Sequence, residues 1–413
     1  MKRRIRSCRT TSGLCAFVLA MVFSTATLAT GQSVIAPTTR HYFSVTPIPF
    51  EQAQSALETE NKTQAISNPA VTSAAASAEI VELARALKND PDLIYQYVHD
   101  NIEFSPLFGA LKGPVGTLLD GRGNSFDQSA LMVALLNQAS LANSAISNVM
   151  FEYGQLHLSS AQLQSWLNVD GNPYSVGGIL AQAGIPSSFF VDGSATLGHV
   201  WVKVSINGTP YVFDPALKAH NWTTGIVANL PNIAGYTQAK FLADASPTVT
   251  PTTIQGVNRT QLRNDLTGYA NNLAAYIRNN APAAGVRDIV GGGTIVPTPF
   301  ANGQSVRQTT NPNQNGTPTD WPSIPSNYHA TVSIGLPGAA AQTYNSDDIY
   351  GHRLSIFFNS SYVPTLYLDG TAVVSGSASS QGAAVGIQIS ISGPWFDSNN
   401  QPFANQSRTQ YVT

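Results

Sequence analysis

A serine, a histidine and an aspartate stand in this sequence in settings that suit acyl-transfer chemistry. Ser125 follows the glycine-containing turn 121–124 and precedes a long apolar stretch, while His199 and Asp214 lie in two short alternating runs later in the chain. In such a site a carboxylate orients an imidazole, and the imidazole takes the proton of a nucleophile that attacks a carbonyl carbon. Ser125, His199 and Asp214 are therefore our candidate catalytic residues.

The start of the chain decides which nucleophiles are available. Residues 1–31 have a basic head, an apolar run too short to span a bilayer and small residues at the end, which is the pattern of a secretory signal peptide. The two cysteines of the chain, Cys8 and Cys15, both lie within it. We therefore expect an exported protein, periplasmic, cell-surface or extracellular, whose mature chain has no thiol for a disulfide, a metal or a nucleophile.

The residues after Ser125 predict a buried helix with the serine at its N-terminus. Residues 126–139 are apolar almost all round, as in a helix at the centre of a domain. Free N–H groups at such a helix start stabilise a developing oxyanion and lower the pKa of a thiol, whereas a serine gains less because it is not ionised in advance. A second interpretation stays open, in which Ser125 and Gln128 form a capping box and the serine merely begins the helix.

His199 and Asp214 are expected on the two strands of one hairpin. Asn207-Gly208 predicts a two-residue turn, which sets Val202 opposite Phe213. Because side chains alternate along a strand, His199, Trp201 and Asp214 then share one face, with His199 and Asp214 as diagonal neighbours. We place Trp201 and Asn124 in a substrate cleft beside this pair. The other interpretation is a hydrogen-bonded core histidine beside an aspartate that belongs to a turn.

The rest of the chain divides by composition. The stretch 113–123 has four glycines and one proline and is expected to be a loop. Short apolar runs near the C-terminus predict an antiparallel β domain with no stop signal at its end, which leaves open that the protein is longer. The expected segments are the signal peptide 1–31, an irregular leader 32–78, the domain with the candidate site 79–245, a linker 246–326 with one amphipathic helix, and the β domain 327–413.

Charge and histidine spacing narrow the classes of partner. The formal net charge is -2, and removing the five basic residues of the signal peptide makes it -7. An acidic surface argues against nucleic acid and against anionic membranes as partners. His99 and Glu103 have helical spacing but lack a third ligand, so we expect no metal and no cofactor.

Taken together, these motifs resemble the transglutaminase-like superfamily, in particular its bacterial exported or cell-surface branch. The resemblance implies an α+β, papain-like fold with a buried central helix and an antiparallel sheet, in which the catalytic cysteine falls on Ser125, the histidine on His199 and the aspartate on Asp214. The stretches that carry the likeness are the Gly-Arg-Gly-Asn turn at 121–124, Gly184-Ile185-Pro186, His199-Val200-Trp201-Val202, Val212-Phe213-Asp214-Pro215, Asp288-Ile289-Val290-Gly291-Gly292 and Tyr350-Gly351-His352-Arg353-Leu354-Ser355.

Three functions follow from a superfamily site that lacks its cysteine. The first is a pseudoenzyme that keeps the cleft for binding peptide or cell-envelope material, since a serine in a thiolate-tuned site loses orders of magnitude in rate. The second is a serine amidase or acyltransferase with Ser125 as nucleophile, His199 as base and Asp214 as the group that orients it. The third is a structural cell-surface module. Enzymatic activity is left open by the sequence.

Overall fold

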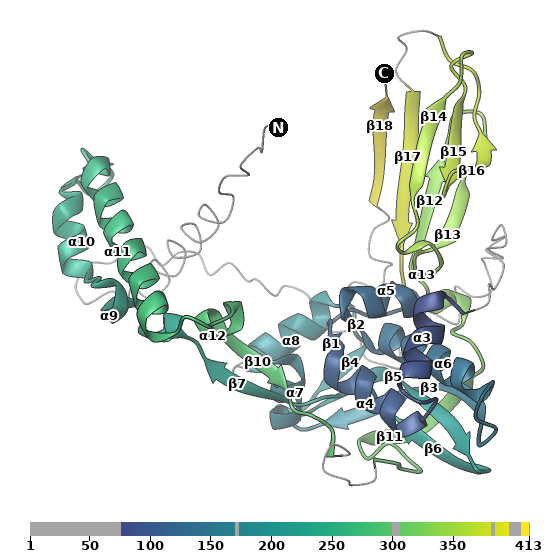
Figure 1. The fold of residues 1–413 in the computed structure, drawn as a ribbon. Helices are drawn as coiled ribbons and strands as arrows, with labels where there is room; N and C mark the ends of the chain where they lie inside the picture. The colour runs from purple at the N-terminus through teal and green to yellow at the C-terminus, as the bar shows by residue number, and fades with distance from the viewer. Residues whose placement is uncertain (1–75, 170–172, 300–305, 381–384, 396–405, 413) are drawn as a thin grey trace, which may run out of the picture. The chain divides into compact units, whose positions relative to one another are not determined.

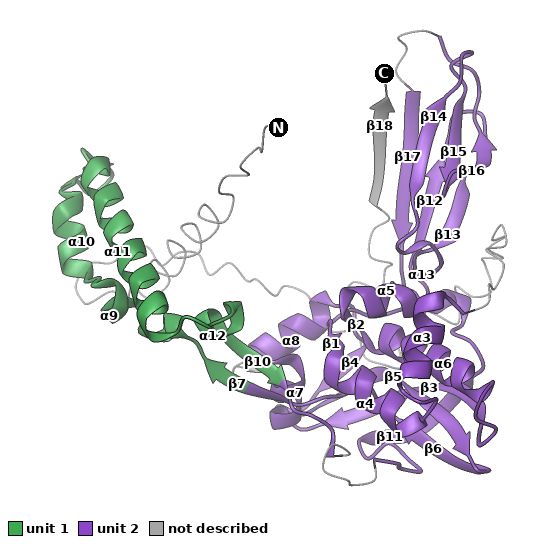
Figure 2. Cartoon of the chain, in the orientation of Figure 1, with its two compact units in different colours: residues 1–40, 222–294 green, residues 41–221, 295–413 purple. Residues whose placement is uncertain are grey.

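The computed structural model describes residues 76–169, 173–299, 306–380, 385–395 and 406–412. Its described part is a mixed α+β structure with antiparallel sheets (Figure 1). The expected signal peptide and nearly all of the expected leader lie outside these ranges. Two compact units divide the described chain: residues 222–294 form one, and the residues before and after that segment form the other (Figure 2).

Helix α6 (Ser125–Ser140) is the central helix of the larger unit, as the sequence predicts. Its side chains Leu131, Met132, Leu135 and Leu136 are fully buried on successive turns. A helix that is apolar all round needs neighbours on every side. It packs against the strands β3 (Ile146–Leu158) and β5 (Ala195–Ile206) and against the helices α3 (Ala78–Ala86), α4 (Pro91–Asn101) and α5 (Gly113–Asp120).

The expected loop at 113–123 is largely helical, so that prediction is wrong. Helix α5 has Pro114 in its first turn and is capped at its C-terminus by Gly121, whose φ of 63° is the left-handed conformation that glycine tolerates best. Gly116 is required for packing, because a Cβ there would lie 2.3 Å from the Tyr350 ring. These glycines cap and pack a helix, although their number is typical of a loop.

The central sheet is antiparallel and carries the expected hairpin. Its strand order is β11-β3-β5-β4, with β6 also paired to β5. The hairpin register sets Val202 opposite Phe213, and Asn207 and Gly208 have φ of 51° and 78°, so the predicted turn and register are confirmed. The strands are β3 (Ile146–Leu158), β4 (Ser187–Phe189), β5 (Ala195–Ile206), β6 (Thr209–Phe213) and β11 (Gln314–Trp321).

Strand β11 lies in the stretch that the sequence predicts as linker. It pairs with β3 at the edge of the sheet, where most of its side chains are exposed or half-buried. An edge strand with little buried surface shows no apolar alternation, and Pro318 also weakens its signal. The linker prediction therefore does not hold here. Helices α7 (Ser160–Leu167) and α8 (Pro173–Gln182) lie between β3 and β4 in the chain.

The C-terminal residues form two antiparallel sheets. One has the order β13-β12-β17-β18 and the other the order β14-β15-β16. Leu366 of the second sheet packs with Ile334, Tyr344 and Ile387 of the first in one apolar cluster. The strands are β12 (Thr331–Gly335), β13 (Gln342–Asn345), β14 (Leu354–Phe358), β15 (Pro364–Leu368), β16 (Thr371–Ser375), β17 (Val385–Ser392) and β18 (Gln406–Val412).

The smaller unit has an apolar cluster of its own. Helix α11 (Arg259–Asn280), the expected amphipathic helix, buries Tyr269 and Leu273 against residues of α9 (Leu230–Ala234) and α10 (Gln238–Ala245). The helices lie in the chain between two paired strands, β7 (His220–Thr224) and β10 (Gly291–Ile295). In the described part of the chain, none of the helices has both the length and the apolar character needed to cross a membrane.

Candidate active site

The hairpin brings His199 and Asp214 into direct contact. His199 Nε2 lies 3.0 Å from Asp214 Oδ1, and the histidine is 1% exposed. An ionised carboxylate can only accept hydrogen bonds, so Nε2 carries the proton in the neutral imidazole. Nδ1 makes no hydrogen bond to any other described residue. The pair thus has the orientation of a catalytic dyad, with one ring nitrogen fixed and the other left for a substrate or nucleophile.

Several donors hold the Asp214 carboxylate in its ionised form. Asn311 Nδ2 donates to Oδ2 at 2.9 Å, and the backbone N–H groups of Leu217 and Ala216 donate to Oδ1 at 3.0 and 3.3 Å. Burial by itself would raise the pKa of Asp214, but the charge of His199 and these hydrogen bonds outweigh it and lower that pKa. Asn311 lies in the expected linker, and no sequence signal pointed to it.

Trp166 supports the same pair from α7. Its ring meets the His199 ring edge to face at 5.7 Å, and its Nε1 donates to the Ala216 carbonyl at 2.9 Å. Trp166 therefore packs against the histidine and fixes the turn that follows Asp214 through this hydrogen bond. No sequence signal pointed to this role, because a tryptophan on an amphipathic helix is usually a core residue.

Ser125 is the first residue of α6 and is 5% exposed. One turn later on the same helix face, Ser129 donates to the Val200 carbonyl at 3.2 Å, so this face of α6 lies against β5 next to His199. The Ser125 hydroxyl makes no hydrogen bond to any other described residue, and it is not completely shut off from solvent. The structure therefore joins His199 to Asp214 but joins neither of them to Ser125 by a hydrogen bond.

The predicted capping box at Ser125 is wrong, and so is the placement of Asn124 in a cleft. Asn124 is the N-cap: its side chain accepts from the Asp127 N–H at 3.0 Å, donates to the Gly109 carbonyl at 2.7 Å and is 1% exposed. Gln128 does not accept from the Ser125 N–H: its Nε2 donates to the Gly123 carbonyl at 2.8 Å, and its Oε1 accepts from Lys218 Nζ at 2.8 Å. Asparagine caps helices as well as serine does, and it stands one residue earlier, which leaves the serine hydroxyl free of this role.

Trp201 does not line a cleft either. It is fully buried, and its Nε1 donates to Glu152 Oε2 at 2.5 Å. Across the sheet its ring packs on Gly154, where a Cβ would lie 2.9 Å from it. Alternation along β5 predicts which residues share a face but not what covers that face, and here both faces of the strand are covered.

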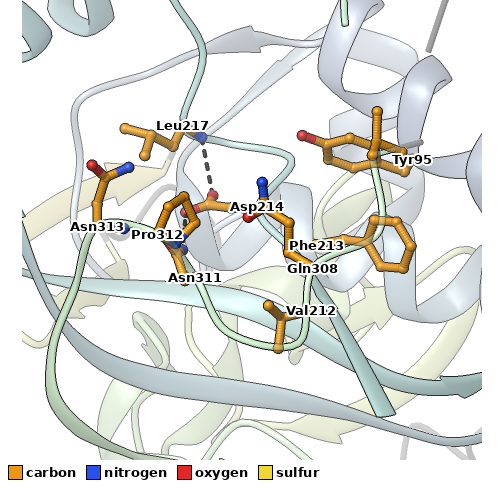
Figure 3. A pocket seen from close by; sticks show the side chains of 10 residues that line it. Tyr95, Val212, Phe213, Asp214, Leu217, Gln308, Asn311, Pro312 and Asn313 are labelled. Carbon is orange, nitrogen blue, oxygen red and sulfur yellow. Dashed lines mark hydrogen bonds between the residues drawn. The ribbon is translucent and has the colours of Figure 1, made fainter. Parts of the chain in front are cut away.

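A small pocket lies on the Asp214 side of the pair. Figure 3 shows its side chains grouped around the Asp214 carboxylate, in a volume of about 150 Å³. Its polar side chains come from α4 (Tyr95), from the residue directly after β6 (Asp214) and from the segment after residue 305. Ser125, Asn124 and Trp201 do not line it. The lining residues are Tyr95, Val212, Phe213, Asp214, Leu217, Val306, Gln308, Asn311, Pro312 and Asn313.

The expected absence of a metal site rested on His99 and Glu103. In the structure His99 Nδ1 contacts Asp100 Oδ1 at 2.8 Å. Throughout the described ranges, no group of three or more histidine, cysteine, aspartate or glutamate side chains is placed to hold a metal ion.

Comparisons of this chain with protein-family models, with curated proteins and with solved structures find no match. What the structure itself defines is an α+β protein whose antiparallel sheet carries a buried, hydrogen-bonded histidine and aspartate. The central helix packs on that sheet and begins with Ser125, whose hydroxyl has no hydrogen-bond partner among the described residues.

Proposed function

We propose that this protein is an exported, transglutaminase-like pseudoenzyme of papain-like fold that binds peptide or cell-envelope material. The observation that carries the proposal is a hydrogen-bonded His199–Asp214 pair on the sheet against which α6 packs, with a Ser125 hydroxyl at the start of α6 that is not hydrogen-bonded to the pair. Ser125 begins the buried central helix at the position where the superfamily has cysteine, and the hairpin carries the other two residues of the superfamily site.

The chemistry of the two nucleophiles explains why this arrangement favours a loss of activity. A thiol beside an imidazole and a helix N-terminus ionises in advance, because both stabilise the thiolate. A serine keeps its proton until the transition state and must pass it to the base through a direct hydrogen bond. The His199 Nδ1 receives no such bond from Ser125. The pair and the helix start therefore suit a thiolate that this chain does not have.

The pocket beside Asp214 is the place that we assign to the ligand. Gln308 and Asn313 present carboxamides in its lining, and carboxamides both donate to and accept from peptide groups and sugar hydroxyls. No lysine or arginine lines it, so nothing in the lining favours an anionic ligand. The Gln308 side chain makes no hydrogen bond to another described residue and is free to bind.

A serine amidase or acyltransferase is the second candidate function. It is favoured by one observation: the Ser125 hydroxyl and the His199 Nδ1 are both without a partner among the described residues. Catalytic hydrogen bonds are often long without substrate and tighten when it binds. In this mechanism His199 would take the Ser125 proton, and Asp214 would stabilise the imidazolium.

Labelling with a fluorophosphonate probe separates the two candidates. The pseudoenzyme proposal predicts no labelling of the mature protein, and none of the Ser125→Ala variant. Ser125→Cys, by contrast, should gain amidase or acyl-transfer activity or thiol reactivity. Labelling of the wild type that the alanine substitution abolishes would establish the serine enzyme and remove the pseudoenzyme proposal.

A further inference from the structure

Lys218 is a charged residue that the proposed function does not use, and it is almost completely buried, with 2% exposure. Its Nζ donates to three backbone carbonyls at the C-terminal end of α4, those of Ile102 at 2.5 Å, His99 at 2.8 Å and Val98 at 3.4 Å. A fourth bond, of 2.8 Å, goes to Gln128 Oε1. A buried lysine with this many acceptors is held in one place.

The three short contacts favour the ammonium form. Carbonyl oxygens can only accept, and only an ammonium has three N–H groups to give. Burial lowers the pKa of Lys218 to about 7. The negative charges of Glu103, Asp214 and Asp100 oppose this shift, because they favour the ammonium. The C-terminal end of a helix also favours a cation. The lysine is therefore fully charged below neutral pH, and its ammonium connects α4 to Gln128 of α6.

Through Gln128 the lysine reaches the start of α6. Gln128 is fully buried and donates from Nε2 to the Gly123 carbonyl at 2.8 Å, two residues before Ser125. Lys218 itself follows Asp214 by four residues, and the short turn between them is fixed by the bond from Leu217 N–H to Asp214. One side chain thus connects the segment that begins α6 with the segment that carries Asp214.

We propose that Lys218 is a positioning residue that holds the Asp214 turn and the start of α6 in register, so that Asp214 can orient His199. The role does not depend on whether Ser125 reacts. Without the ammonium, the Asp214 turn would keep its own backbone bonds to Asp214 and the bond from Trp166 to the Ala216 carbonyl, none of which involves α6. The α6 start would then lose its connection to that turn.

The tautomer of His199 tests this role, since loss of stability alone would not change it in the folded protein. We expect ¹⁵N imidazole spectra of the wild type to show the Nε2–H tautomer at neutral pH. In Lys218→Met, the ratio of Nε2–H to Nδ1–H should fall by roughly tenfold, the loss of about one hydrogen bond to a charged group. Lys203→Met is the matched control. Its ammonium bonds Glu152 and Asp320 on the same sheet, and its loss should leave the tautomer unchanged.

Gln128→Leu covers the case in which Lys218→Met does not fold. It keeps the lysine bonds to α4 and removes the connection to α6, together with the Gln128 Nε2 bonds to the carbonyls of Gly123 and Glu103. We therefore expect shifted backbone amide signals for Gly123 and Ser125 and, because the lysine no longer reaches α6, a partial loss of the Nε2–H tautomer. A folded Lys218→Met protein with the wild-type tautomer ratio would overturn the proposal. So would a folded Gln128→Leu protein whose Ser125 amide and His199 ring signals match those of the wild type.

Discussion

Replacing Asp214 by asparagine tests whether the carboxylate is held as the structure indicates. Asp214 accepts from His199 and from two backbone N–H groups through Oδ1, and from Asn311 Nδ2 through Oδ2. An asparagine that keeps its oxygen toward His199 turns an NH₂ group toward the Asn311 NH₂ group. Asn311 cannot simply flip, because its Oδ1 accepts from the Asn313 N–H at 3.1 Å. The variant therefore buries two donors that face each other.

The size of the effect follows from these contacts. Weakening a charge-assisted bond to an ordinary one removes about 1 kcal/mol, and an unsatisfied buried donor adds roughly 1–3 kcal/mol. We expect Asp214→Asn to lower the free energy of unfolding by roughly 2–4 kcal/mol at pH 7. Asp320→Asn, which alters a surface ion pair with Lys203, should change it by less than about 1 kcal/mol.

Urea unfolding of the wild type and both variants at several pH values is the assay. The pKa of Asp214 lies below its ordinary value of 3.8 in the folded protein. The stability that the carboxylate contributes is therefore present above the unfolded pKa and is lost as the pH falls through the folded pKa. The difference between wild type and Asp214→Asn should shrink in that acidic range. Equal stability of the two proteins at pH 7 would refute the assignment of the bonds around Asp214.

Three further substitutions test the surroundings of the site. Burial raises the pKa of Asp127 from 3.8 to about 6. The stability that its protonated form contributes is therefore present below the unfolded pKa and is lost as the pH rises through about 6. In urea titrations, the free energy of unfolding of Asp127→Asn should gain roughly 2–3 kcal/mol relative to that of the wild type between pH 4 and pH 7. If Trp201 is a buried donor to Glu152, Trp201→Phe lowers stability by roughly 1–3 kcal/mol, and an unchanged urea midpoint would contradict this. Gly116→Ala should lower the melting temperature, because the new Cβ would collide with the Tyr350 ring. Adding Tyr350→Ala should recover part of that loss. A double variant that melts no higher than the single variant would contradict this packing.

The sequence was sufficient for the parts of the fold that rest on local rules. The Asn207-Gly208 turn fixed the hairpin register, and that register alone placed His199 within reach of Asp214. The apolar residues after Ser125 likewise predicted α6, because no other arrangement buries a segment that is apolar on all sides. Both inferences depend only on residues close together in the chain.

The errors arose where distant segments decide the outcome. Asn311 reaches Asp214 across 97 positions of the sequence, in a polar stretch without periodicity. Trp201 shares the face that alternation assigns, yet it is fully buried, with its ring on Gly154 and its Nε1 bonded to Glu152 of β3. Asn124 rather than Ser125 caps α6, a difference of one residue that depends on the backbone path from Gly109. Composition and spacing do not contain this information.

The central claim, that the site is tuned for a thiolate, is tested most directly by the thiol pKa in Ser125→Cys. The rate of iodoacetamide alkylation, measured against pH, gives that pKa. Ser140→Cys is the control, because it puts a thiol at the opposite end of the same helix, where the helix dipole disfavours a thiolate. The account predicts a pKa below about 7.5 at position 125 and about 8.5 or above at position 140. Equal pKa values at the two positions would contradict it.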